Sequence, residues 1–69
     1  MSNLTENGFS LEDDVELPDG TRAEITEILP MRVNYYRNDW EFCDASLVKV
    51  YLLVDDTYQY WLDIQLRKI

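Results

Sequence analysis

Histidine is absent from this 69-residue chain, and cysteine, glycine and proline are scarce, at one, two and two residues. Without histidine no Ser-His-Asp triad can form, and Ser2, Ser10 and Ser46 have no other candidate base nearby in the sequence. A single thiol in a chain without histidine can neither close an internal disulfide nor complete a zinc site. These absences exclude hydrolytic triads and structural zinc.

Basic residues and long apolar runs are also in short supply. The chain has 6 basic residues against 14 acidic ones, which gives a net charge of −8 at pH 7. No stretch approaches the roughly 18 apolar residues of a membrane span. Residues 1–5 lack the basic start and apolar stretch of a signal peptide. Together with the lone Cys43, these features predict a cytoplasmic protein.

The remaining candidates for chemistry are two acidic pairs and one thiol. Asp13-Asp14 and Asp55-Asp56 lack the spacing of a calcium loop, and adjacent side chains point apart on an extended backbone. Cys43 has no histidine to activate it, which favours a small buried residue over a nucleophile. We therefore predict a protein that is not an enzyme and uses no metal or other cofactor.

The clearest structural signal is the tetrad Leu17-Pro18-Asp19-Gly20, which lies between two stretches of alternating apolar and polar residues, 14–17 and 22–25. Proline presets φ at the second turn position, aspartate can bond back to the turn backbone, and glycine accepts a positive φ. The pattern predicts a β-hairpin in which Val15, Leu17, Ala23 and Ile25 face inward.

Further strands are expected along the rest of the chain. The second hairpin strand should cover 22–29, with a bulge near Thr26-Glu27 and an end at Pro30. Residues 31–36 and 40–43 can pair across a turn at 37–39, as a hairpin or a long loop. The run 47–54 predicts the longest strand, apolar on both faces, because its valines and tyrosine disfavour a helix.

The last third of the chain predicts a turn at 55–57, a strand at 58–62, a 3₁₀ turn at 63–65 and a closing strand at 66–69. Residues 1–9 are polar and predict a flexible leader, followed by one small β-barrel domain over 10–69. The expected fold class is all-β, as a partly open barrel of five or six short antiparallel strands.

Aromatic residues make up 13% of the chain, and they have two interpretations. Large rings fill a small core efficiently, with one tryptophan as its anchor. Alternatively, exposed rings could form a cage or peptide groove that stacks on a cation or a proline. The candidate cage residues are Tyr35, Tyr36, Trp40, Tyr58 and Trp61. Of these, Tyr35, Tyr36 and Trp40 are our predicted partner-binding aromatics.

Acidic charge is concentrated at the beginning of the chain. Residues 1–29 hold eight acids against Arg22 alone, whereas 30–69 hold six acids and five bases. The predicted acidic face is either a solubility surface or a partner-binding surface that imitates a phosphate backbone. Its candidate partner-binding residues are Glu12, Asp13, Asp14, Glu16, Asp19, Glu24 and Glu27.

Over residues 13–69 the chain resembles the small SH3-like barrels. The resemblance rests on 14–20 leading into 23–25, on the strand 48–54, and on Tyr60-Trp61-Leu62 followed by Gln65-Leu66-Arg67. It implies an SH3-like fold and a module that binds proteins or nucleic acids, of a kind found in phages and mobile elements. The chain departs from nucleic-acid-binding members because it lacks a basic groove, and from proline-peptide binders because no matching acidic-aromatic loop is present.

These features favour a non-enzymatic module that binds a basic protein through its acidic face and exposed aromatics, as an accessory or inhibitor of a host machine. Direct binding of nucleic acid or membrane is not expected. Two alternatives remain open. One is a homo-oligomeric structural or assembly component, which includes a homodimer. The other is a nucleic-acid module that uses Arg32, Arg37, Lys49, Arg67 and Lys68.

Overall fold

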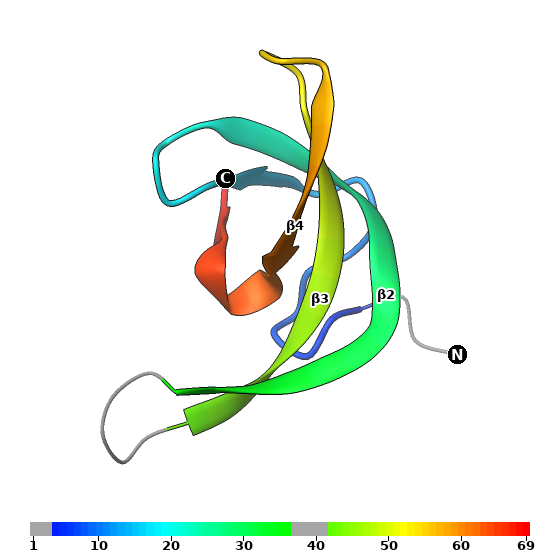
Figure 1. Ribbon diagram of the computed structural model, residues 1–69, viewed down its shortest axis with the longest axis vertical. Coiled ribbons are helices and arrows are strands. Elements are labelled where there is room, and N and C mark those ends of the chain that lie inside the picture. The colour runs from blue at the N-terminus through cyan, green and yellow to red at the C-terminus, as the bar shows by residue number, and fades with distance from the viewer. Residues whose placement is uncertain (1–3, 37–41) are drawn as a thin grey trace.

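A computed structural model describes residues 4–36 and 42–69, with backbone only at Tyr35 and Phe42. Its strands are β1 (Asp14–Glu16), β2 (Arg22–Tyr36), β3 (Phe42–Leu52), β4 (Thr57–Leu62) and β5 (Arg67–Lys68), with the 3₁₀ turn η1 (Asp63–Gln65) before β5. All paired neighbours are antiparallel, in one sheet of order β4-β3-β2-β1-β5 (Figure 1). The all-β, antiparallel prediction is confirmed, and the sheet is open, with β4 and β5 at its edges.

The first hairpin forms at the predicted tetrad. Gly20 N–H donates to the Leu17 carbonyl at 2.9 Å, and Leu17 N–H donates to Thr21 at 2.8 Å. The Asp19 carboxylate accepts the Thr21 N–H at 2.9 Å, and Gly20 has φ of +90°. Asp19 and Gly20 therefore have the roles that their chemistry predicts.

β2 and β3 are two long curved strands that lie side by side (Figure 1). The register of β2 on β3 shifts between Ile25 and Glu27, which confirms the predicted bulge, and again between Ile28 and Arg32. The prediction that Pro30 ends the strand is wrong. Pro30 lies inside the second shift, where no residue of β2 is in register with β3, so its missing N–H removes no ladder bond.

The strand predicted at 47–54 differs from the observed β3. β3 begins earlier and ends at Leu52, so that Leu53 and Val54 lie in an exposed turn, and the longest strand is the 15-residue β2. The predicted pairing of 31–36 with the segment after the turn is present. It runs from Tyr36 opposite Phe42 to Arg32 opposite Ser46. The turn itself, 37–41, lies outside the described residues.

The core lies on the inner face of the curved sheet. Val15, Ile25, Val48 and Val50 are fully buried at its centre. Among the described side chains, Phe9 is the only aromatic in the buried cluster, and Trp61 packs against that cluster while partly exposed. Trp61 therefore packs at the border of a core whose centre is filled by β-branched side chains on neighbouring strands, and Trp40 lies outside the described residues.

The polar segment before β1 packs on the sheet. Thr5 and Phe9 are buried, and Glu6 N–H donates to Ser46 Oγ of β3 at 3.0 Å. Lys68 of β5 donates to the Gly8 carbonyl at 2.7 Å. Residues 4–9 thus differ from the predicted flexible leader, because Thr5, Phe9 and the main chain between them have partners in the fold. Residues 1–3 lie outside the description.

Candidate functional site

The outer face of the sheet carries one row of side chains across four strands. Cross-strand partners run from Asp14 of β1 to Glu24 of β2, then to Tyr51 of β3 and Tyr58 of β4. Residues directly opposite each other in a ladder share a face and contact one another. Carboxylates and aromatic rings are therefore neighbours on this surface.

A second row lies beside the first. Glu27 of β2 is opposite Lys49 of β3, and Lys49 is opposite Tyr60 of β4. We call Asp14, Glu24 and Glu27 the acidic rim, and Lys49, Tyr51, Tyr58 and Tyr60 the tyrosine face. The opposite side of β3 carries Val48, Val50 and Leu52, which are buried. Strand alternation thus separates the core from this surface.

The rings of the tyrosine face contact each other and one cation. The Tyr51 and Tyr58 ring centres are 5.2 Å apart, with a tilt of 52°. Lys49 Nζ lies 4.8 Å from the centre of the Tyr58 ring and 6.0 Å from that of Tyr60. Tyr58 and Tyr60 remain 57% and 58% exposed. These rings therefore accept cations on their faces while most of their area contacts water.

Tyr51 is fixed by the turn that precedes β4. Its hydroxyl donates to the Asp56 carboxylate at 2.7 Å. This hydrogen bond raises the pKa of the Tyr51 phenol above its ordinary value, because ionisation would remove the donated proton and place two anions in contact. The neutral ring is thus held in one orientation on the tyrosine face.

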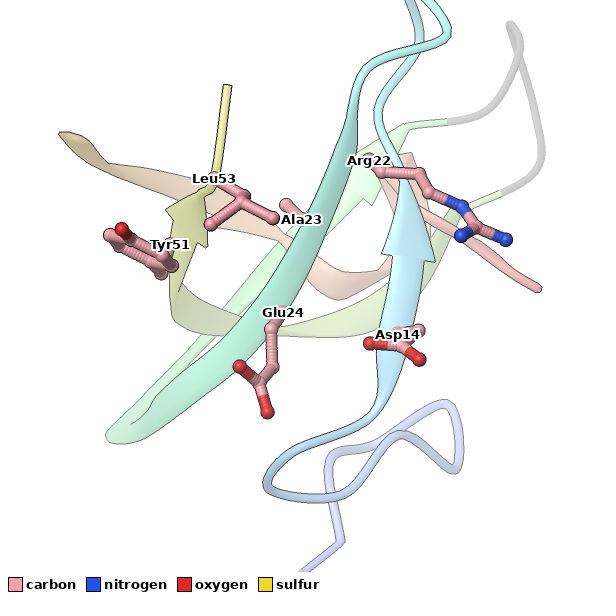
Figure 2. Close-up of a pocket in the computed structure, with 6 residues that line it drawn as sticks. All are labelled: Asp14, Arg22, Ala23, Glu24, Tyr51 and Leu53. Atoms are coloured by element: carbon pink, nitrogen blue, oxygen red, sulfur yellow. The ribbon is translucent and has the colours of Figure 1, made fainter. Parts of the chain in front are cut away.

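A depression of about 190 Å³ joins the acidic rim to the tyrosine face. Its walls come from β1, β2, β3 and the turn after β3 (Figure 2), and its lining residues are Asp14, Arg22, Ala23, Glu24, Tyr51 and Leu53. Asp14 and Glu24 supply carboxylates at one side, whereas Tyr51 and Leu53 supply apolar surface at the other. Arg22 adds one cation to the lining, and the two carboxylates outnumber it. The depression therefore matches a long side chain with an apolar stem and a positive end.

Of the four other predicted acids, Asp13, Asp19 and Glu16 have side-chain partners. The Asp13 carboxylate accepts from Ser10 N–H at 2.9 Å, and the pKa of Asp13 is lowered chiefly by this bond. The pKa of Asp19 is lowered chiefly by the Thr21 N–H. Glu16 pairs with Arg67. Glu12 is exposed at a backbone φ of +69°, outside the strands. The predicted acidic face therefore divides into the acidic rim, the turn residues Asp13 and Asp19, the paired Glu16 and the exposed Glu12.

Of the candidate aromatics, Tyr58 lies on this surface and Tyr36 does not. Tyr36 is at the far end of β2 from the first hairpin, where it is 69% exposed, and Tyr35 precedes it. The Tyr35 side chain and all of Trp40 lie outside the described residues. Sequence reasoning missed Tyr51 and Tyr60, and it gave Lys49 a role only in the alternative nucleic-acid module. Their signal is the period of two, because Lys49 and Tyr51 alternate with Val48, Val50 and Leu52, and Tyr60 lies two residues after Tyr58.

A buried polar junction lies away from this surface. Asp63 is fully buried, and its carboxylate accepts from Asn7 N–H, Asn7 Nδ2 and Ser46 N–H, each at 3.0 Å. In the described part of the chain every buried side-chain N or O atom has a partner, and no three His, Cys, Asp or Glu side chains form a group that could hold a metal. The junction is therefore structural.

No protein-family model matches the chain, and neither a curated protein nor a solved structure is detectably similar to it. Over residues 4–36 and 42–69, no helix has the length and hydrophobicity needed to cross a membrane.

Proposed function

We propose that this protein is a non-enzymatic interaction module that binds a basic protein partner through the acidic rim and the tyrosine face. The observation that carries the proposal is the row Asp14, Glu24, Tyr51 and Tyr58, which brings carboxylates and exposed rings together on one surface. Carboxylates attract a basic partner over a distance, and aromatic rings supply contact area that loses little entropy on binding.

The contact of Lys49 with Tyr58 supports the idea that the tyrosine face can accept a cation. The Lys49 ammonium group already lies over the Tyr58 ring, which shows that this ring face accommodates a cation within the fold. An arginine or lysine from a partner would bind in the depression between Glu24 and Tyr51, whose lining does not include Lys49. There its stem would contact Leu53 and its charge would meet Asp14 and Glu24.

Two further expectations bear on the class of module. The SH3-like resemblance is supported by the open sheet of five strands and by the 3₁₀ turn before the last strand. Phosphate mimicry has weaker support, because Asp13 and Asp19 bind turn amides and Glu16 is paired with Arg67. Fewer carboxylates then remain to follow a phosphate track.

The experiment is an NMR titration of the labelled protein with a short arginine-containing peptide and with its glutamine-substituted counterpart. We expect the chemical shifts of Glu24, Tyr51 and Tyr58 to change with the arginine peptide and not with the glutamine peptide. Binding should be weaker at high salt because the attraction between charges is screened. Tyr58→Ala should reduce affinity at least about tenfold, the loss typical of a hot spot. Tyr36→Ala is the matched control for an exposed tyrosine elsewhere on the sheet.

Equal binding of the two peptides, or an equal loss in Tyr36→Ala and Tyr58→Ala, would contradict the proposal. Either result would show that arginine recognition does not occur on the tyrosine face.

A further inference from the structure

β4 is an edge strand with one paired neighbour. The sheet order places it at the end, next to β3, and within the described residues Thr57–Leu62 pair with β3 alone. Thr57, Tyr58, Gln59 and Tyr60 are all exposed. An edge strand presents a row of N–H and C=O groups that another strand can bind.

The hydrogen bonds around β4 show which backbone groups face outward. The Lys49 carbonyl accepts the Thr26 hydroxyl of β2 at 3.1 Å, so the backbone of Lys49 faces β2. In an antiparallel ladder the N–H and C=O of one residue point to the same side, and bonded pairs alternate with non-bonded pairs. Lys49 and its partner Tyr60 are therefore a non-bonded pair, and the Tyr60 backbone faces away from β3.

A second hydrogen bond supports the same alternation. Leu62 N–H donates to Oε1 of Gln65 at 3.0 Å, so this N–H does not bond to β3. Because alternate residues point the same way, the N–H and C=O groups of Tyr58 and Tyr60 face the open edge together with the Leu62 N–H. The Gln65 side chain occupies the last of these positions. A strand that pairs with β4 would therefore bond to Tyr58 and Tyr60.

We propose that two copies of this chain pair through their β4 strands in antiparallel orientation, with Tyr58 of each copy opposite Tyr60 of the other. A two-fold axis at Gln59 produces this register, and it matches all the outward-facing N–H and C=O groups of the two tyrosines. The two sheets then form one continuous sheet, with Tyr58 and Tyr60 from both copies as neighbours on its outer face. Such cross-strand aromatic pairs add to the stability of a ladder.

The distribution of charge favours a second copy over a basic strand. β4 has the sequence Thr-Tyr-Gln-Tyr-Trp-Leu, without a charged residue, although the chain carries −8. A basic strand at this edge would approach the ammonium group of Lys49, which lies against Tyr58 and Tyr60. The acidic rim is on β1 and β2, separated from the edge by β3 and β4. At roughly 4.8 Å per strand its repulsion is largely screened at physiological salt.

Sedimentation over a concentration series tests the pairing. We expect the mass to rise from 8.2 kDa towards twice that value as concentration increases. Tyr60→Pro removes an outward N–H that β3 does not use, so this variant should fold and pair at least about tenfold more weakly. Tyr60→Thr retains the N–H and should pair more strongly than Tyr60→Pro. Gln59→Pro is the matched contrast, because it removes an N–H bonded to β3 and should lower the melting temperature.

Amide hydrogen exchange on the unmodified protein gives a readout that does not depend on any variant. Protection at Tyr58 and Tyr60 should increase with protein concentration, whereas Lys68 on the opposite edge strand should not change. A single-chain mass at all concentrations would overturn the proposal. A doubled mass without new protection at Tyr58 and Tyr60, or a folded Tyr60→Pro variant that pairs as the parent does, would also overturn it.

Discussion

Some carboxylates of this chain accept hydrogen bonds from backbone N–H groups close to them in the sequence, and Asp13 is the clearest case. The pKa of Asp13 is lowered from its ordinary value of 3.8, chiefly by the Ser10 N–H and further by the Ser10 hydroxyl. Because the folded-state value is the lower one, the stabilisation is fully present above pH 3.8 and is lost as pH falls through the folded-state pKa. Asp13→Asn should therefore be less stable than the parent at neutral pH, and the difference should shrink in acid. Thermal melts across this range measure it, and a constant difference would contradict the assignment.

Gly20 is the residue on which the first hairpin depends. At its φ of +90° a Cβ would meet no atom within 4 Å, so a substitution there tests backbone strain alone. Gly20→Val should cost about 1–2 kcal/mol, because a β-branched residue is strained at positive φ. The melting temperature should fall by roughly 4–8 °C per kcal/mol. Gly20→Asn is the control, since asparagine tolerates this region, and equal melting of the two variants would refute the role of strain.

At the scale of elements, Asp63 connects the segment before β1, β3 and η1. Its carboxylate accepts three hydrogen bonds at 3.0 Å while fully buried. Asp63→Asn replaces one acceptor oxygen with a donor that faces the amide donors of Asn7, and should cost about 1–3 kcal/mol. Exchange at the Asn7 and Ser46 amides should become faster. Asp55→Asn, in the exposed turn, should change stability by less than about 0.5 kcal/mol, and a similar loss in both variants would rule out the junction.

The elements that were predictable from sequence are those encoded by adjacent residues. The turn at Leu17-Pro18-Asp19-Gly20, the bulge near Glu27 and the 3₁₀ turn of η1 each follow from neighbours along the chain. The passage of β2 through Pro30 depends on the register of a separate strand. The contact of Asn7 with Asp63 joins residues 56 positions apart. No local pattern reports such pairings, so the continuous strand and the packed segment 4–9 were missed.

For the molecule as a whole, the sequence predicted the acids of the candidate site better than its aromatics. Asp14, Glu24 and Glu27 were predicted because acidic charge is concentrated before residue 30. The predicted partner-binding aromatics were Tyr35, Tyr36 and Trp40. Strand pairing instead brings Tyr51, which was not predicted, and Tyr58, which was only a candidate cage residue, into one row with the acids. The sheet order determines which rings lie beside which charges, and no single stretch of the sequence encodes that order.

The acidic rim connects stability with binding, because Asp14 and Glu24 are like charges directly opposite each other. Such a pair destabilises a sheet, typically by about 0.2–1 kcal/mol. Glu24→Gln should therefore raise the melting temperature by a few degrees at low salt and by less at high salt. Glu27→Gln is the matched control, because Glu27 is opposite Lys49 and its loss removes an attraction.

Both variants lose one negative charge, so both should associate more slowly with a basic peptide at low ionic strength. Only Glu24→Gln should gain stability. This difference separates the effect of the Asp14–Glu24 repulsion from the effect of the overall charge of −8. Calorimetric melts and stopped-flow association rates measure the two effects. Equal stability changes in the two variants would show that net charge alone governs the fold. Unchanged association rates would show that the acidic rim serves only solubility. If Glu24→Gln gains stability, Glu27→Gln loses it and both associate equally slowly, the acidic rim attracts a partner at the cost of fold stability.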